Sequence, residues 1–209
     1  MSVYRLELPV SREEVERLRV GDVVYITGVV VTARDQTHRR LIRLLESGEK
    51  PPIDLEGLAV YHCGPVVRRE GDEWRVVAAG PTTSYRMGML VPRLVELSGA
   101  RLVIGKGGLP DDAADALSRV GGVYLAYPGG AGALAASRVR RVLGVYWLEE
   151  LGVPEAMWVF EVQDFGPLTV AIDARGGNLY REVRRRVEEN RVRVREEAAR
   201  IAEELVGES

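Results

Sequence analysis

VVYITGVVVTARDQTHRRLIRLL, residues 23–45, joins a strand pattern to a helix pattern. Residues 23–32 are dense in β-branched side chains and are long enough for a buried strand. After a polar cluster at residues 33–40, leucine and isoleucine recur at helical spacing. A buried strand that leads through polar residues into a helix is typical of a mixed α/β fold.

The same alternation continues on both sides of this stretch. A capping box, Ser11-Arg12-Glu13-Glu14, predicts a short helix, and Pro110 begins another. Residues 68–72 predict a hairpin turn. The remaining strands are expected at residues 3–8, 58–63, 74–78, 102–104, 123–126, 139–147, 157–162 and 168–172. Further helices are expected at residues 82–97 and before residue 137.

From Tyr180 onward the sequence becomes strongly charged. Apolar residues recur there at helical or heptad spacing, and they are Val183, Val187, Val194, Ala198, Ile201 and Leu205. We expect one long C-terminal helix over residues 181–209, after a domain over residues 1–180. Two interpretations stay open: its narrow apolar stripe contacts another subunit, or the helix is solvated and packs only on its own domain.

Composition excludes several classes of protein. The chain has 29 basic and 31 acidic residues, which gives no sign of a nucleic-acid partner. Cys63 is the sole cysteine, so the chain alone cannot supply a metal or cluster site built on several cysteines. The N-terminal residues lack the apolar run of a signal peptide, and no stretch is long enough to span a membrane. We therefore expect a soluble, cytoplasmic protein with no membrane partner.

Three loops have the character of anion sites: residues 34–39, 82–86 and 105–108. In Gly80-Pro81-Thr82-Thr83-Ser84-Tyr85-Arg86, a turn precedes three hydroxyl residues and an arginine. If Thr82 begins a helix as its N-cap, Thr82 and Arg86 share one face. The alternative is an ordinary capped helix with a surface arginine.

The other two loops also offer cations. Arg34 and His38 lie four residues apart, so on a helix they could grip a carboxylate together. Asp35 and Arg39 have the same spacing and could form an ordinary helical ion pair. Lys106 follows Gly105 in a glycine loop, where the backbone can approach a ligand closely. The alternative for Lys106 is a solvated loop lysine.

A set of motifs carries a resemblance that covers about residues 3–180. They are Thr32-Ala33-Arg34-Asp35-x-x-His38-Arg39, Tyr61…Gly64-Pro65, Gly80-Pro81-Thr82-Thr83-Ser84-x-Arg86-Met87, Gly105-Lys106-Gly107, Gly129-Gly130-Ala131, Gly152-x-x-Glu155-Ala156-Met157-Trp158 and Asp164-Phe165. In this order they resemble the β subunit of class I iron–sulfur hydro-lyases, which include class I fumarate hydratase and L(+)-tartrate dehydratase.

The resemblance implies a fold and a division of labour. The fold is a swivelling β/β/α domain, here followed by the long C-terminal helix. The family's [4Fe–4S] cluster is held by three cysteines of a partner α subunit, and this chain binds no metal. We therefore expect an α2β2-type hetero-oligomer that acts on a dicarboxylate such as fumarate or malate.

The resemblance also implies roles for named residues. Thr82 matches a threonine proposed to take the C3 proton, with Arg86 beside it and Lys106 at the substrate. The residues implied to bind substrate are Arg34, Asp35, His38, Thr83 and Gly105. Threonine is a poor base at neutral pH and needs nearby cations, or a relay such as Asp35.

The reaction implied is reversible hydration of fumarate to (S)-malate. Dehydration of L(+)-tartrate is the alternative among enzymes. A stand-alone anion-binding domain is the non-enzyme alternative, although the presence of Thr82, Arg86 and Lys106 together argues against a degenerate domain.

Overall fold

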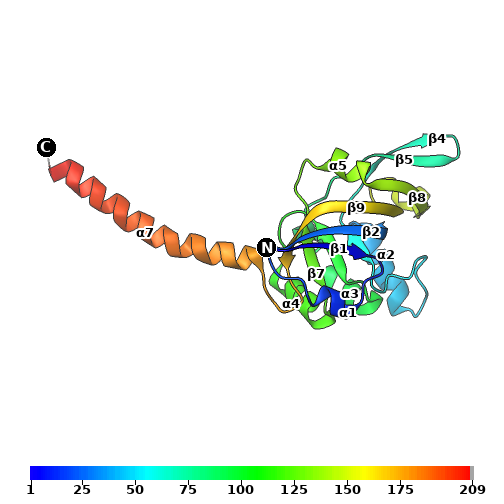
Figure 1. Cartoon of the computed structure of the whole chain (residues 1–209), viewed down its shortest axis with the longest axis horizontal. Coiled ribbons are helices and arrows are strands. Elements are labelled where there is room, and N and C mark those ends of the chain that lie inside the picture. The colour runs from blue at the N-terminus through cyan, green and yellow to red at the C-terminus, as the bar shows by residue number, and fades with distance from the viewer. Residues whose placement is uncertain (208–209) are drawn as a thin grey trace. The chain divides into compact units, whose positions relative to one another are not determined.

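The protein is a mixed α/β structure with a long C-terminal helix, as the sequence predicts (Figure 1). A computed structural model describes residues 1–207, with side chains for residues 1–201. The chain divides into a sheet-based unit, Met1–Gly177, and a second unit that begins at Asn178 and contains helix α7 (Leu179–Gly207). Among the described residues, no helix combines the length and the apolar character that a membrane span requires.

Seven strands form the main sheet. They are β1 Val3–Glu7, β2 Val23–Thr32, β3 Ala59–Tyr61, β6 Leu102–Gly105, β7 Val123–Ala126, β8 Val139–Tyr146 and β9 Met157–Ile172, in the order β1-β2-β3-β6-β7-β9-β8. Strands β1, β2, β3, β6 and β7 are parallel, whereas β9 runs antiparallel to β2, β7 and β8. Because Thr169 of β9 is paired with both Val23 and Ala126, the pairings close a ring of β2, β3, β6, β7 and β9.

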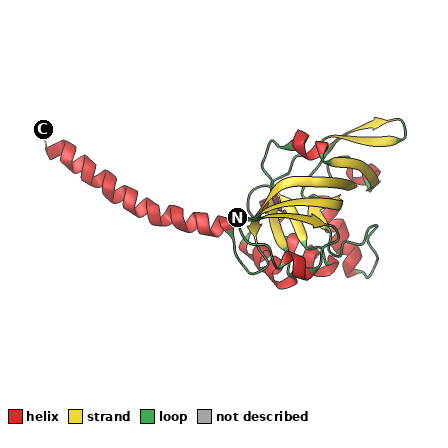
Figure 2. Ribbon diagram, viewed as in Figure 1, coloured by secondary structure: helices red, strands yellow, loops and turns green. Residues whose placement is uncertain are grey.

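Helices and a hairpin surround this ring. The helices are α1 Arg12–Val15, α2 Asp35–Glu46, the 3₁₀ helix η1 Ser84–Met87, α3 Val91–Ser98, α4 Asp111–Val120, α5 Gly132–Ser137 and α6 Leu148–Leu151. Helices α2, α3 and α4 gather on one side of the strands (Figures 1 and 2). The predicted hairpin is confirmed as β4 (Val66–Glu70) paired with β5 (Glu73–Ala78).

The core lies inside the ring and between the ring and its helices. Tyr61 and Phe165 pack edge to face inside it, with ring centroids 5.3 Å apart. Trp74 of the hairpin contacts the buried Trp158 of β9 at the same separation. Burying each large apolar side chain contributes about 1.5–3 kcal/mol to stability. This packing holds the ends of the parallel strands in place.

One local prediction from the sequence is confirmed by the structure, and another is wrong. The predicted capping box is present, because Glu14 N donates to Ser11 Oγ and Ser11 N donates to the Glu14 carboxylate. The two strands predicted at residues 157–162 and 168–172 are instead one continuous strand, β9. The ladder is irregular between the two predicted segments, where Asp164 has a φ of 48° and donates its N–H to Thr27 Oγ1.

Candidate active site

The loops that follow β2, β3 and β6 meet at the carboxyl ends of these parallel strands, which is where α/β folds place ligands. Each loop is hydrogen-bonded to the neighbouring strand end: Ala33 N donates to Tyr61 O at 2.9 Å, and His62 N donates to Ile104 O at 2.8 Å. The Thr82 segment joins this edge through an isolated bridge between Thr83 and Lys106. The structure therefore brings the three predicted anion loops together.

Thr82 is held by its backbone on both sides. Its N–H donates to His62 O at 2.7 Å, and its carbonyl accepts from Lys106 N at 3.2 Å. Ser84 N then donates to Lys106 O at 3.0 Å. Within the described part of the chain, the hydroxyls of Thr82 and Thr83 make no hydrogen bond to protein. The backbone therefore fixes the position of Thr82, while its hydroxyl has no partner in the described part of the chain.

The predicted helical cap at Thr82 is wrong. Only a short 3₁₀ helix, η1, follows it, with Thr83 at the N-cap position and no side-chain cap, and α3 begins separately at Val91. Because both backbone polar groups of Thr82 bond to neighbouring segments, Thr82 lies outside any helix. It therefore does not share a helical face with Arg86.

Two arginines of the site already have carboxylate partners. Arg34 Nε lies 3.3 Å from Glu155 Oε1, and both side chains are about four-fifths buried. Arg86 bonds to Asp35 Oδ2 through Nε at 3.1 Å and Nη2 at 3.0 Å. The predicted helical pair of Asp35 with Arg39 is therefore wrong, because the Asp35 carboxylate turns to Arg86 instead.

Lys106 is the cation of the glycine loop after β6. In the part of the chain that the structure describes, its ammonium group forms no ion pair, and the side chain is half-buried. The aliphatic part of the Lys106 side chain lies against the loop after β7, because a Cβ built at Gly129 would be 3.4 Å from Lys106 Cδ. A cation without a carboxylate partner at the strand ends favours an anionic ligand at this position.

Gly105 leaves room for a side chain of the interior, and its predicted role in substrate binding stays a prediction. A Cβ built there would lie 1.8 Å from Ser84 Oγ and 3.1 Å from His62 Nδ1. Ser84 fills that space and is fully buried. It accepts a hydrogen bond from the Tyr124 hydroxyl at 2.9 Å and shares one with His62 Nδ1 at 2.8 Å.

His38 is also internal in this structure, and its predicted contact with substrate stays a prediction. Its side chain is 0% exposed, and its Nδ1 bonds to Arg34 O at 2.9 Å. Burial lowers the pKa of His38 to about 4, and burial also holds the pKa of His62 well below its usual value. The two rings lie edge to face, with centroids 5.1 Å apart. Both imidazoles are therefore neutral supports beneath the loops.

Sequence reasoning missed three residues of this site: Glu155, Ser84 and His62. Glu155 holds Arg34 and also accepts from Gln36 N at 2.9 Å, at the start of α2. It stands inside the motif Gly152-x-x-Glu155, which was the one signal that could have found it. Nothing in the spacing indicates that Ser84 and His62 meet beneath Gly105.

The residues present do not form a metal site. Among the described residues, no group of three or more His, Cys, Asp and Glu side chains is arranged to hold a metal ion. Cys63 is buried, and burial raises the pKa of its thiol to about 12. The residues that the structure describes therefore offer no fitting set of ligands for an iron–sulfur cluster.

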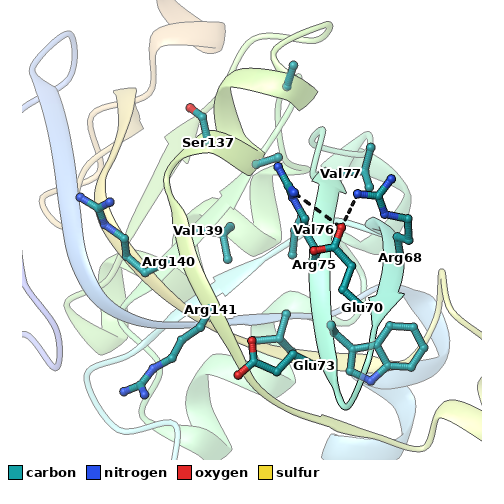
Figure 3. A pocket seen from close by; sticks show the side chains of 14 residues that line it. Arg68, Glu70, Glu73, Arg75, Val76, Val77, Ser137, Val139, Arg140 and Arg141 are labelled. Atoms are coloured by element: carbon teal, nitrogen blue, oxygen red, sulfur yellow. Dashed lines mark hydrogen bonds and ion pairs between the residues drawn. The ribbon is translucent and has the colours of Figure 1, made fainter.

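A separate hollow of about 590 Å³ lies between the β4–β5 hairpin, α5 and β8 (Figure 3). Three of its four arginines have carboxylate partners: Arg68 and Arg75 share Glu70, and Arg141 pairs with Glu161, whereas Arg140 donates to the neutral Gln163 Oε1. None of the predicted site residues lines it. At the strand ends, Lys106 and the Thr82 hydroxyl have no partner among the described residues, which marks these loops as the candidate anion site.

Comparison with known proteins identifies the family. The family model described as "Fumarase C-terminus" matches residues 2–183. The L(+)-tartrate dehydratase subunit beta of Escherichia coli K12 is 42% identical over 193 residues, covering 92% of this chain and 94% of the relative. The "Putative L(+)-tartrate dehydratase subunit beta" of Methanocaldococcus jannaschii is 44% identical over 86% of this chain and 92% of the relative.

A third relative is longer. The "Putative fumarate hydratase class I" of Geobacillus stearothermophilus is 41% identical over 182 residues, which cover 87% of this chain and 34% of that protein. The family match extends over nearly all of the sheet-based unit, including every loop of the site. The chain belongs to the Fumarase C-terminus family.

Proposed function

We propose that this chain is the β subunit of a hydro-lyase that adds water to, or removes it from, a four-carbon dicarboxylate. The observation that carries the proposal is the convergence of Arg34, Arg86, Lys106 and Thr82 at one strand edge. Family membership and the names of the relatives support a hydro-lyase subunit. We propose fumarate and (S)-malate as the substrate pair.

L(+)-tartrate is the second candidate substrate. Relatives named as tartrate dehydratase subunit beta match this chain over more than nine-tenths of their own length. The fumarate hydratase relative matches over only a third of its length. The residues of the site suit either substrate, since both carry two carboxylates that cations must hold.

The proposed chemistry assigns separate tasks to the side chains. Arg34 and Lys106 hold substrate carboxylates, and Asp35 keeps the Arg86 guanidinium directed along the edge of the site. Positioning of this kind lowers the barrier because the reacting carbon no longer has to be oriented during the reaction. The Thr82 hydroxyl exchanges the proton at C3, with Lys106 close by along the backbone to favour the deprotonated oxygen.

The proposal requires a second chain. A [4Fe–4S] cluster, if used, polarises the substrate hydroxyl, and its ligands must come from an α subunit because the described residues of this chain lack them. The longer fumarate hydratase relative has room for such a region in the same polypeptide, outside the third that matches this chain.

The test is an anaerobic co-expression of this chain with its α partner, reconstituted with iron and sulfide and assayed on malate, fumarate and both tartrate stereoisomers. Thr82→Val removes the hydroxyl at nearly constant shape, and Thr82→Ser keeps it. We expect Thr82→Val to lower kcat by about 10²–10⁴-fold, as for loss of a general base, and Thr82→Ser to retain most activity. A loss below tenfold in Thr82→Val would remove Thr82 from this role. Substantial activity of this chain alone would refute the two-subunit proposal.

A further inference from the structure

Helix α7 is one long helix (Figure 1), and its apolar residues recur along one exposed stripe. Val183, Val187, Val194 and Ile201 are between 47% and 59% exposed, and every side chain from residue 182 to residue 201 is exposed. Ion pairs on the helix, such as Arg185–Glu189 at 3.7 Å, contribute only about 0.3–0.5 kcal/mol each. These ion pairs do not explain why apolar residues line one side of an exposed helix. A partner that covers the stripe would explain it.

The spacing of the apolar residues in the stripe follows a symmetric repeat. The positions are 183, 187, 190, 194, 198, 201 and 205, and all but Asn190 are apolar. Steps of 4, 3, 4, 4, 3 and 4 residues form an 11-residue repeat, which keeps a stripe nearly straight along a helix. The order of steps is the same from either end, so the stripe is symmetric about Val194.

That symmetry suits a second copy of the same helix running in the opposite direction. With Val194 at the centre, Val187 falls level with Ile201 of the other copy, and Asn190 falls level with Ala198. By sequence position, Val183 falls level with Leu205. Every apolar position then meets a counterpart, and each Asn190 lies beside a small residue.

The charges of the helix agree with the same direction. Residues 179–195 contain seven arginines and three glutamates, whereas residues 196–207 contain four glutamates and one arginine. A parallel pair places two positive halves together and two negative halves together. An antiparallel pair places the positive half of each copy against the negative half of the other, and it also opposes the helix dipoles.

We propose that α7 pairs antiparallel with α7 of a second copy of this chain, with Val194 at the two-fold axis. The inference does not depend on the proposed enzymatic function, because it concerns only the helical unit and is tested without substrate or α partner.

The first experiment measures the mass of the full chain alone by sedimentation velocity. Val192 is a matched control: it is 55% exposed against 57% for Val194, but it lies about 200° around the helix from Val194. We expect a dimer for the natural sequence and for Val192→Glu. Val194→Glu should weaken association at least 100-fold, because two carboxylates then meet at the axis. A monomeric natural chain, or a Val194→Glu chain that stays dimeric, would overturn the proposal.

The second experiment determines direction by disulfide cross-linking, with the natural chain as background because Cys63 is buried. Val194→Cys should cross-link to itself, and a mixture of Val187→Cys and Ile201→Cys should cross-link to each other. Val187→Cys alone should not, since its two copies lie about 21 Å apart at 1.5 Å per residue. Cross-linking of Val187→Cys alone would indicate a parallel pair and overturn the proposal.

Discussion

Gly105→Ala is predicted to disrupt the support beneath the Thr82 loop while leaving every residue that faces solvent unchanged. Gly105 has no positive φ, so alanine carries no backbone strain there. The added methyl group would instead lie 1.8 Å from Ser84 Oγ. Ser84 must then leave its place between His62 and Tyr124.

The magnitude combines two broken hydrogen bonds with one steric clash. The two hydrogen bonds to Ser84 Oγ are worth about 1 kcal/mol each. Overpacking of a filled interior adds about 1–3 kcal/mol. We expect a loss of about 3 kcal/mol in the free energy of unfolding, which corresponds to a fall of about 6–12 °C in Tm for a unit of this size.

Ser84→Ala makes the prediction specific. Alone it should cost about 2 kcal/mol, because the same two hydrogen bonds are removed. In the double variant the clash with Oγ is gone, and the new methyl group meets Ser84 Cβ at 3.2 Å. The double variant should therefore lose about 3 kcal/mol, well short of the sum of about 5 kcal/mol expected for independent sites.

The assay is chemical denaturation of the four chains, followed by circular dichroism, with Gly144→Ala as control. A Cβ at Gly144 meets nothing closer than 3.7 Å, so this variant should change stability by less than about 0.5 kcal/mol. Additive losses for Gly105→Ala and Ser84→Ala would show that Ser84 does not occupy the space that Gly105 leaves. A Gly105→Ala chain as stable as the natural one would refute the reasoning outright.

Two further predictions rest on buried titratable groups. The pKa of His38 is about 4 in the folded chain against an ordinary value of 6.5, so the unfolded state binds more protons between these values. The contribution of His38 to the free energy of unfolding should be fully present above pH 6.5 and should fall by about 3 kcal/mol as the pH drops to 4. Denaturation measured across this pH range should therefore show a smaller dependence of stability on pH in His38→Leu. An equal slope in both chains would contradict it. Cys63 should resist thiol reagents in the folded state and react fully in guanidinium chloride, because the thiol is buried with a pKa of about 12. Rapid reaction of the folded chain would contradict this.

The sequence predicts what depends on local pattern. Residues 23–32 and 123–126 are found as strands with the bounds expected, because β-branched and apolar runs flanked by turn signals favour strands in most contexts. The capping box at Ser11 and the hairpin before Trp74 follow from similarly local chemistry. These features needed no knowledge of the rest of the chain.

Contacts between distant segments escaped prediction. Asp35 has Arg39 at ideal helical spacing, yet it bonds to Arg86, which is 51 residues away. Thr82 has the sequence context of a helix cap, yet its backbone is taken by His62 and Lys106. In each case a tertiary partner replaced the local one, and the sheet order that supplies such partners is not encoded in spacing.

The pairing of the arginines determines which of them can hold a substrate. Arg86 uses both Nε and Nη2 on Asp35, so most of its planar donor edge is committed. Arg34 approaches Glu155 through Nε, while its Nη1 points along Gly64, where a Cβ would lie 3.0 Å away. Among the described residues, Arg34 Nη1 and Nη2 have no carboxylate partner, so these donors remain for a ligand at the strand edge. We therefore expect Arg34 and Lys106, which forms no ion pair among the described residues, to be the two cations that would hold a dicarboxylate, and we expect Arg86 to fix the position of the Thr82 loop.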